Sequence, residues 1–276
     1  MADTATAFVP GHVTGFFSAH PDPDDPTKSG SRGAGLALAD GVTVTVEPAA
    51  ETAVSLDDVA VEMDAVDRVL GALRTEARVT VETPLPLGSG FGVSGGVALG
   101  TALAANAAFD RRLSENELVT IAHGAEVQAG TGLGDVVAQA RGGMPIRLEP
   151  GGPQHNLLDG LPARPEVEYL TLGELSTEDV ITGDTSLLSE AGQRALSNLV
   201  EEPTLARFMH QSRQFAREAE LLTDDVRQVI TDANEAGGSA SMAMLGETVF
   251  CVGGGLSAAG YDARTTAVHP GGATLR

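Results

Sequence analysis

The sequence predicts a mixed α+β fold in two lobes. Segments of alternating polarity, typical of strands, are interspersed with segments whose apolar residues recur at helical spacing. A Gly- and Pro-rich segment, residues 150–165, interrupts this pattern near the middle of the chain. The length of 276 residues is enough for one large domain or two smaller ones with sizeable cores. We therefore expect an N-terminal lobe, 1–155, and a C-terminal lobe, 156–276.

The first hundred residues contain several short strand-like segments. The apolar or alternating segments are residues 5–9, 12–18, 35–39, 42–47 and 77–82. Asp40-Gly41 separates two of them, which predicts a β-hairpin. Residues 20–30 have loop composition, and the prolines among Asp22, Asp24 and Asp25 favour a solvated turn over a metal site. Apolar residues from Val59 to Leu73 recur at helical spacing, so we expect a helix there.

The remaining elements alternate between helices and strands. Ser114 and Glu117 form a capping box that predicts a helix through Ala129, and a short helix is expected from Asp135. We expect further strands at 145–148, 166–172, 248–252 and 265–269, and further helices at 203–222 and 223–236.

Residues 86–96 form the densest glycine segment, and an uncharged, Ala-rich helix is expected after it at 97–109. Glycines let a backbone approach a ligand closely, and a helix N-terminus presents free N–H groups, so the segment predicts a phosphate-binding loop. Two other motifs fit here: G-x-G-x-x-G, with Asp110 as a ribose contact, and the G-x-S-x-G of a hydrolase nucleophile. Both need a strand running straight into the turn, whereas Pro84 and Pro86 separate the glycines from the expected strand. A flexible loop without function is the remaining alternative.

The chain is strongly acidic, with 38 Asp and Glu residues against 17 Lys and Arg and a formal net charge of −21. Such a field repels nucleic acids and anionic membrane surfaces, so we expect neither as a partner. Lys28 is the only lysine, and this acidic, lysine-poor composition is typical of proteins from salt-loving archaea. An anionic substrate would need local arginine, a helix dipole or a metal ion.

Cys251 is the only cysteine, which excludes an internal disulfide and fits a reducing cytoplasm. The first residues lack the basic and apolar regions of a signal peptide, and the uncharged stretch at 97–109 is rich in Gly and Ala. A buried core helix is therefore favoured over a membrane span, and Cys251 is expected in the core.

Three segments together resemble the landmarks of the GHMP kinases, in the order that the family has them. They are Pro10-Gly-His-Val-Thr-Gly-Phe-Phe17, the glycine segment 86–96, and Ala236-Gly-Gly-Ser-Ala-Ser-Met-Ala-Met-Leu-Gly246. More narrowly, residues 9–17, 30–35 and 130–138 resemble the archaeal pantoate kinases. Phe91 and Val93 depart from the residues usual in the wider family, which leaves Ser94 as the hydroxyl at the helix entry. The resemblance covers nearly the whole chain and implies an N-terminal lobe like ribosomal protein S5 domain 2 and a ferredoxin-like C-terminal lobe.

The resemblance also implies ATP and Mg²⁺ as cofactors. The residues it assigns to the nucleotide are Pro86, Gly88, Ser89, Gly90, Gly92, Ser94, Gly95 and Gly96. It places Ser94 and Glu126 on Mg²⁺, an ion that prefers hard oxygen ligands. The alternatives are a helix N-cap for Ser94 and a solvated helix face for Glu126. It places Asp135 as the catalytic base near the acceptor hydroxyl, and the alternative for Asp135 is a helix cap.

For the acceptor, the resemblance implies pantoate, phosphorylated to 4-phosphopantoate on the archaeal route to coenzyme A. Arg147 suits a carboxylate because its planar fork donates two parallel hydrogen bonds, and its alternative is a surface ion pair. The resemblance places His12 near pantoate, and Ser31 and Arg32 are weaker candidates for the same pocket. Another small hydroxy acid such as mevalonate or homoserine, an inactive nucleotide-binding regulator, and a nicotinamide oxidoreductase stay open as alternatives, as does a homodimer.

Overall fold

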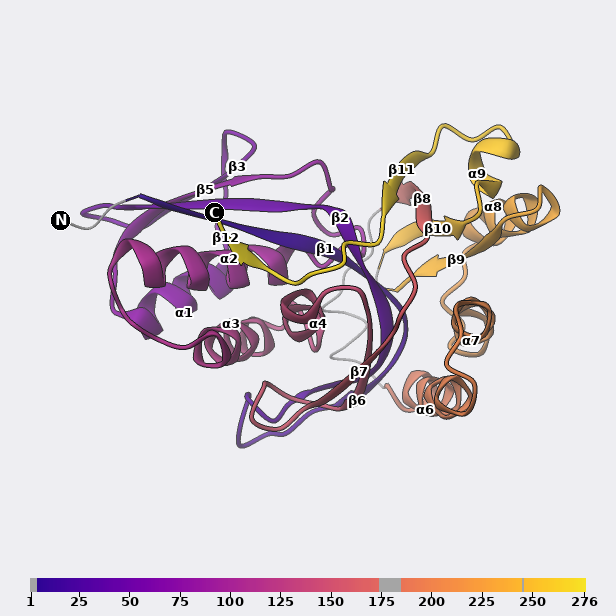
Figure 1. The fold of residues 1–276 in the computed structure, drawn as a ribbon, viewed down its shortest axis with the longest axis horizontal. Coiled ribbons are helices and arrows are strands. Elements are labelled where there is room, and N and C mark those ends of the chain that lie inside the picture. Colours follow the sequence, from indigo (N-terminus) through magenta and orange to yellow (C-terminus); the bar gives the residue numbers. More distant parts are fainter. Residues whose placement is uncertain (1–3, 174–184, 245) are drawn as a thin grey trace.

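The computed structural model describes residues 4–173, 185–244 and 246–276, and these residues form two β-sheets with helices packed on them (Figure 1). The larger sheet has the order β12-β1-β2-β5-β3-β4, and β6 pairs with β2 and β7. Its strands are β1 (Ala5–His20), β2 (Gly30–Pro48), β3 (Ala53–Leu56), β4 (Val59–Ala60), β5 (Ala77–Glu82), β6 (Met144–Glu149), β7 (Leu157–Leu161) and β12 (Thr274–Leu275). The mixed α+β class expected from the sequence is confirmed.

The smaller sheet is antiparallel with the order β11-β8-β10-β9. Its strands are β8 (Glu166–Gly173), β9 (Ser239–Ala243), β10 (Glu247–Val252) and β11 (Arg264–Ala267). Cys251 is buried in β10, as expected. Because β12 returns to pair with β1 in the larger sheet, a lobe boundary near residue 155 stays a proposal.

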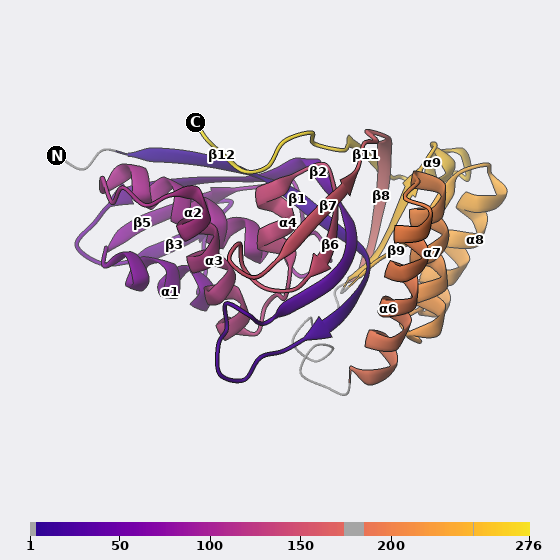
Figure 2. The same ribbon diagram turned by 60° about the horizontal axis from the view of Figure 1, so that its bottom comes forward.

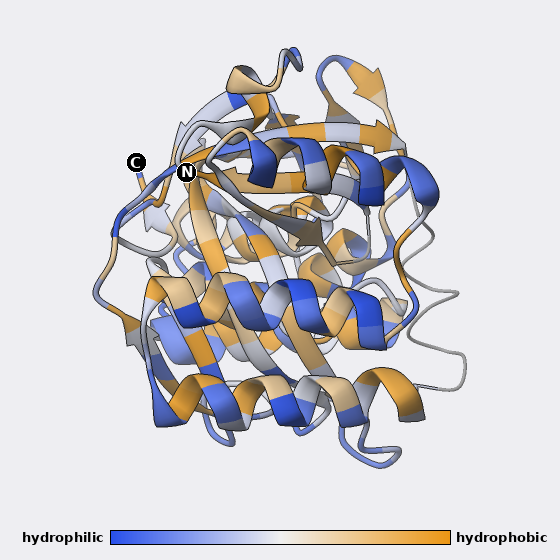
Figure 3. Ribbon diagram, turned by 90° about the vertical axis from the view of Figure 1, so that its right-hand side faces the viewer, coloured by the Kyte–Doolittle hydropathy of each residue, from blue (hydrophilic) through white to orange (hydrophobic). Residues whose placement is uncertain are grey.

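Two groups of helices pack on the sheets. In Figure 1, α1 (Asp64–Leu73), α2 (Val93–Ala108), α3 (Glu115–Ala129) and α4 (Asp135–Arg141) lie together below the larger sheet. The helices α7 (Leu205–Glu218), α8 (Asp224–Glu235) and the short α9 (Gly255–Ala258) pack on the smaller sheet (Figure 2). The helix α6 (Ser186–Glu201) lies beside α7 and packs against β1 and β2 of the larger sheet. Hydrophilic and apolar residues alternate around the helices of this second group, which is the pattern of helices with one buried face (Figure 3). None of the described helices is long and apolar enough to cross a membrane.

The central helix is α2, and its position explains its composition. It carries no charged side chain and packs between β1 and β2 on one side and α1 and α3 on the other. Gly100 makes the close approach to the sheet possible, because a Cβ atom there would lie 2.9 Å from the Cβ of Val44. The expectation of a buried core helix is confirmed. The helix begins at Val93, however, four residues earlier than expected, so Ser94, Gly95 and Gly96 belong to its first turn.

The expected hairpin at Asp40-Gly41 is wrong. β2 runs continuously through these residues, and its pairing with β1 skips from Pro10↔Gly41 to Gly11↔Leu38. Residues 39 and 40 therefore form a β-bulge, which explains why a turn-like dipeptide and a proline occur within long strands. The two apolar segments that Pro10-Gly11 separates in the sequence likewise form the single strand β1.

Most other elements lie where the sequence predicts them, with ends shifted by a few residues. The strand at 77–82 and the capping box of Ser114 and Glu117 are confirmed, as are the helix from Asp135 and the strands that became β6, β8, β10 and β11. The helix expected from Val59 begins instead at Asp64, and Val59 is 64% exposed in the short strand β4. In the loop before β2, the Asp22 side chain accepts hydrogen bonds from the N–H groups of Asp24 and Asp25, which confirms a turn.

Candidate active site

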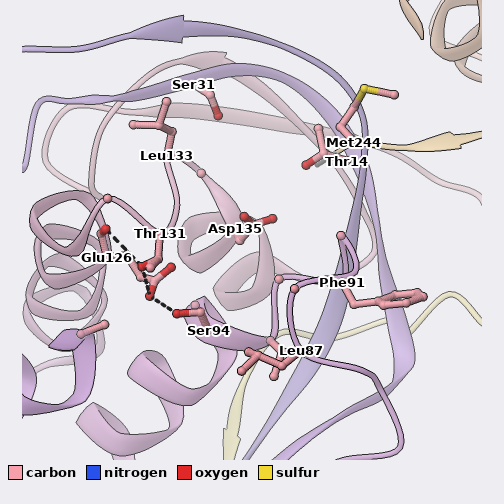
Figure 4. A pocket seen from close by; sticks show the side chains of 18 of the residues that line it. Thr14, Ser31, Leu87, Phe91, Ser94, Glu126, Thr131, Leu133, Asp135 and Met244 are labelled. Atoms are coloured by element: carbon pink, nitrogen blue, oxygen red, sulfur yellow. Dashed lines mark hydrogen bonds between the residues drawn. The ribbon is translucent and has the colours of Figure 1, made fainter. Parts of the chain in front are cut away.

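A cavity of about 640 Å³ lies where the glycine segment, α2, α3 and the sheet meet. Its wall includes the loop before α2, the turn between α3 and α4, and residues of β1, β2 and β6 (Figure 4). Met244, at the end of β9, contributes from the smaller sheet. The cavity thus joins segments between β1 and β6 with the end of β9.

The loop between β5 and α2 adopts a conformation that requires glycine. Gly88, Gly90 and Gly92 have φ values of 76°, 85° and 62°, in the left-handed region that other residues rarely occupy. Gly92 is the N-cap of α2, so the N–H groups of the first helical turn have no partner within the helix. Gly92, Val93, Ser94 and Gly95 all line the cavity. A backbone of this form offers an anion several N–H donors and the positive end of the helix dipole.

The residues expected to contact the nucleotide fall into two groups. Those that line the cavity are Gly88, Gly90, Gly92, Ser94 and Gly95. Pro86, Ser89 and Gly96 lie outside its lining. The carbonyl of buried Ser89 accepts a hydrogen bond from Thr248 Oγ1 at 2.8 Å, and a Cβ atom on Gly96 would lie 2.9 Å from Val42 Cγ2. The second group therefore shapes the loop and its packing.

Ser94 and Glu126 are brought together from α2 and α3. Ser94 Oγ donates to Glu126 Oε1 at 2.6 Å, and Thr131 Oγ1 donates to the same oxygen at 2.9 Å (Figure 4). The two alternatives are wrong, because Gly92 and not Ser94 is the N-cap and because Glu126 is only 2% exposed. The pKa of Glu126 is raised to about 7, because the effect of burial is larger than that of the hydrogen bonds from the two hydroxyl groups, which lower the pKa. A buried carboxylate and a hydroxyl facing one cavity are a fitting oxygen set for Mg²⁺.

Asp135 and His12 form a second buried pair. His12 Nδ1 lies 2.6 Å from Asp135 Oδ1, and the imidazole is fully buried whereas the Asp135 side chain is 24% exposed and lines the cavity. Burial lowers the pKa of His12, so we assign a neutral ring that donates through Nδ1. Burial raises the pKa of Asp135, but the hydrogen bond from His12 and the charge of Arg147 act in the opposite direction, and the net pKa is lowered. Asp135 is therefore ionised at neutral pH. His12 itself lies behind Asp135 and does not line the cavity.

Arg147 is a buried cation in the cavity wall. It lies on β6 opposite Gly33 of β2, is 2% exposed, and its Nε and Nη1 atoms have no hydrogen-bond partner among the described residues. The alternative of a surface ion pair is therefore wrong. Ser31 lines the cavity beside it, and Gly134 leaves room for both, since a Cβ atom there would overlap Ser31 Oγ and lie 2.9 Å from Arg147 Nε. Arg32 is different: its Nε donates to the Leu148 carbonyl and it does not line the cavity.

The charges around the cavity are mainly negative. Glu62, Asp64, Glu126 and Asp135 line it, and Arg147 is the only basic residue among the described lining residues. A buried guanidinium with two unpartnered nitrogens in this setting suits a small anion, because burying a charge without a partner is costly.

Several lining residues were not singled out from the sequence. They are Thr14, Glu62, Met63, Asp64, Ala65, Leu87, Thr131, Leu133 and Met244. Thr14 and Met244 stand inside two of the motif segments and could have been found there. The segment 62–65 carries no motif, since only the fold brings the start of α1 to the cavity.

Comparisons with known proteins show the family of the chain. The profile of the GHMP kinases N terminal domain matches residues 57–143. A pantoate kinase from Methanospirillum hungatei is 34% identical over 259 residues, which cover 90% of this chain and 87% of that protein. The chain belongs to the pantoate kinase family of GHMP kinases. A second pantoate kinase, from Methanocaldococcus jannaschii, is 34% identical to this kinase over 258 residues, with 89% and 91% of the two chains covered.

Solved structures show the same fold for the kinase. A structure described as a phosphotransferase related to the CoA biosynthesis pathway has a TM-score of 0.89 at 28% identity and covers 99% of both chains. A putative homoserine kinase from Listeria monocytogenes has a TM-score of 0.68 at 18% identity, with 99% of both chains covered, which indicates a shared fold alone. The two-lobed GHMP kinase fold is confirmed. The dinucleotide-binding and hydrolase interpretations are wrong, since Asp110 is exposed and paired with Arg112 and Ser94 is bonded to a glutamate.

Proposed function

We propose that the kinase phosphorylates the primary hydroxyl of pantoate with ATP, forming 4-phosphopantoate and ADP. The observation that carries the choice of acceptor is Arg147, a buried guanidinium with unpaired nitrogens that lines the cavity with Asp135. A hydroxy acid with a carboxylate at one end and a hydroxyl at the other matches this pair of groups. The pantoate kinases that resemble this chain over nine-tenths of its length support the same acceptor.

The donor end of the cavity is the glycine loop with the N-terminus of α2. Backbone N–H groups there would bind the phosphates of ATP. Ser94 Oγ and Glu126 Oε1 would hold Mg²⁺, which when bound neutralises phosphate charge during phosphoryl transfer. No lysine or arginine lines this loop among the described residues, so the chain's own contribution is backbone dipoles and metal ligands. The negative lining makes the cation a requirement for nucleotide binding.

At the acceptor end, Arg147 and Ser31 would bind the carboxylate and orient the hydroxyl toward Asp135. The hydroxyl oxygen bonds to the γ-phosphorus of ATP, the bond from that phosphorus to the bridging oxygen breaks, and ADP leaves. Asp135 Oδ2 accepts the hydroxyl proton, while its Oδ1 stays bonded to His12. A base that is ionised at neutral pH and fixed by a buried partner suits this step. We place the reaction in the cytoplasm, and a homodimer stays an expectation from the sequence.

The acceptor is tested with a panel of pantoate, pantoyl lactone, mevalonate and homoserine, assayed with ATP and Mg²⁺ at high salt. We expect turnover with pantoate and little with the lactone, which lacks the free carboxylate. Arg147→Ala should raise the pantoate KM on the order of a hundredfold and leave the ATP KM unchanged, because a buried charged contact is lost. Arg147→Lys should restore only part of this, since an ammonium cannot donate as a planar fork. Equal use of lactone and acid would show that the carboxylate is not recognised.

The variant Asp135→Asn tests whether the protein is a kinase or an inactive nucleotide-binding protein. The amide is nearly the same size as the carboxylate but cannot accept the proton. We expect nucleotide binding to be retained while turnover falls roughly a hundredfold to ten-thousandfold, the usual contribution of a positioned base. Unchanged turnover together with lower stability would assign Asp135 a structural role only.

A further inference from the structure

Two apolar side chains stand out at the acceptor end of an otherwise polar part of the cavity. Leu133 and Met244 both line the cavity, Leu133 half-buried and Met244 only 2% exposed. In Figure 4, Leu133 lies by Ser31, Met244 lies by Thr14, and the Asp135 carboxylate is seen between these two pairs. Both pairs thus lie around Asp135 in this view, and Gly134, the neighbour of Leu133, packs against Ser31 and Arg147.

Both side chains are held in place by the elements that carry them. Met244 N donates to the Thr14 carbonyl at 2.9 Å, and Thr14 Oγ1 lies 3.5 Å from His12 Nδ1, the atom that bonds Asp135. Leu133 precedes Gly134, which packs tightly against Ser31 and Arg147. The positions of the two apolar groups relative to Asp135 and Arg147 are thus fixed from both sides of the cavity.

Two aromatic residues of the lining pack against aromatic rings in other parts of the structure. The Phe17 ring packs against Phe215 with centroids 6.0 Å apart, and the Phe91 ring packs against Tyr169 at 4.9 Å. Leu87 belongs to the glycine loop and is 39% exposed. Met63 and Ala65 line the cavity at the start of α1, and Val93 lines it at the start of α2. Leu133 and Met244 are the apolar lining residues placed beside Ser31 and Thr14, where they can contact the carbon skeleton of an acceptor.

We infer that Leu133 and Met244 select an acceptor whose carbon next to the reacting hydroxymethyl group carries two methyl groups. The inference rests on the proposed function, because it takes the hydroxyl to lie at Asp135 and the carboxylate at Arg147. The carbons between those groups then face Leu133 and Met244. A methyl group buried there improves binding roughly fourfold. Straight-chain hydroxy acids lack both contacts and leave the space between the two side chains unfilled.

The test compares kcat/KM for pantoate with that for 2,4-dihydroxybutanoate, the same skeleton without the methyl groups. We expect the wild type to prefer pantoate on the order of tenfold or more. Leu133→Ala and Met244→Ala should each lower this preference about threefold to fivefold with the ATP KM unchanged. Leu133→Met and Met244→Leu keep the side-chain volume and should keep the preference. Leu157→Ala, at an exposed position on β7 outside the cavity, is the control.

An unchanged preference in both alanine variants, or an equal fall in Leu157→Ala, would overturn the inference. Leu133 is only half-buried, so Leu133→Ala decides the question even where Met244→Ala fails to fold. A wild type that does not phosphorylate pantoate would overturn the proposed function itself. Normal pantoate turnover with an unchanged preference overturns only the role of Leu133 and Met244.

Discussion

His12 and Asp135 are separated by 123 positions in the sequence, yet their side chains meet at 2.6 Å beneath the cavity. The contact uses Nδ1, the ring nitrogen nearer the backbone, while Nε2 faces Gly35. A Cβ atom at Gly35 would overlap Nε2, so glycine at this position leaves space for the ring. This geometry makes His12 a positioning residue for Asp135, because it fixes one carboxylate oxygen and leaves the other for the substrate.

Two amide substitutions at His12 distinguish positioning from simple packing. The amide nitrogen of His12→Asn occupies the place of Nδ1, whereas that of His12→Gln occupies the place of Nε2. We expect His12→Asn to keep kcat within about fivefold and His12→Gln to lower it on the order of a hundredfold, since a misplaced base is costly. The ATP KM should not change in either variant. Steady-state kinetics with thermal unfolding as a control checks this, and equal kcat values in the two variants would contradict it.

Glu126 gives a prediction about pH. The pKa of Glu126 in the folded kinase is about 7, above the ordinary value of 4.5. Between pH 4.5 and pH 7, the folded state therefore keeps a proton that the unfolded state has already released. The free energy of unfolding therefore falls as pH rises through this window, by at most roughly 3 kcal/mol. In metal-free buffer, Glu126→Gln should remove this part of the decline. The stability difference between variant and wild type should grow from pH 4.5 to pH 8.

Chemical denaturation across that pH range measures the difference, and Mg²⁺ should stabilise the wild type more than Glu126→Gln at pH 8. A difference that does not depend on pH would show that Glu126 titrates normally.

At the residue level, motifs predicted more than local patterns could. The family resemblance placed Ser94, Glu126 and Asp135 in one site, and Arg147 was chosen as a cation for a substrate carboxylate. The structure brings these four residues to one cavity. Their burial was not predictable, because the solvated or buried face of a helix such as α3 depends on what packs against it. Glu62 and Asp64 were missed for the same reason, since their place in the wall depends on where α1 starts.

Among the elements, the turn between β9 and β10 has the closest contact with the glycine loop. A Cβ atom on Gly246 would overlap the Ser89 carbonyl, and Thr248 Oγ1 donates to that same carbonyl at 2.8 Å. On the other side, a Cβ atom on Gly90 would lie 3.1 Å from the Met244 carbonyl. The smaller sheet thus holds the glycine loop in its position through contacts with the backbone of Ser89 and Gly90.

Gly246→Ala tests this contact. The added methyl group must push the turn away from Ser89, so we expect the ATP KM to rise roughly tenfold, since small displacements in a binding loop weaken its interactions. Gly71→Ala is the matched control, because Gly71 lies on exposed α1 with open space around it. That variant should keep its kinetics and gain about 0.5 to 1 kcal/mol of stability. Nucleotide titrations and unfolding curves check both, and identical kinetics in the two variants would contradict the role of the turn.

Helices and strands were predicted well where the sequence pattern is local, and less well where the pairing between strands determines the structure. The capping box of α3 and the alternation of β5 are local signals, and both elements have the expected bounds. The dipeptide Asp40-Gly41 gives an equally strong local signal for a turn, but β1 pairs with β2 along both halves and converts it into a bulge. The helix α6 went unpredicted, although Leu188, Ala195 and Leu199 lie on its buried face.

At the scale of the whole molecule, the main feature is the large negative net charge. The net charge is −21, and the ion pairs found among the described residues are mostly exposed, where each contributes little. Mutual repulsion of the carboxylates therefore opposes the compact state at low ionic strength. The same repulsion acts on ATP at a cavity lined by four acidic residues, Glu62, Asp64, Glu126 and Asp135.

We expect the melting temperature to rise as KCl increases from about 0.1 M to 2 M, because the screening length shortens from about 10 Å to under 3 Å. The ATP KM should fall over the first part of the same range. Sucrose at matched osmolality is the control, since it stabilises compact states by exclusion without screening charge. Calorimetry in both series measures the effect. Equal stabilisation by sucrose and KCl would show that repulsion is not the destabilising factor.

The aromatic contacts of β1 have a consequence for dividing this protein into pieces. Phe16 and Phe17, on β1, pack against Phe208 and Phe215 of α7 with ring centroids 6.0 Å apart in each pair. A cut near residue 155, in the connection between β6 and β7, would therefore uncover matching aromatic surfaces on both fragments, and exposed apolar patches of this kind promote association. Expressed separately, the fragments should aggregate; expressed together, they should recombine into an active kinase. The connection between β6 and β7 is thus a candidate position for a split-protein reporter, whose signal depends on the association of the two fragments.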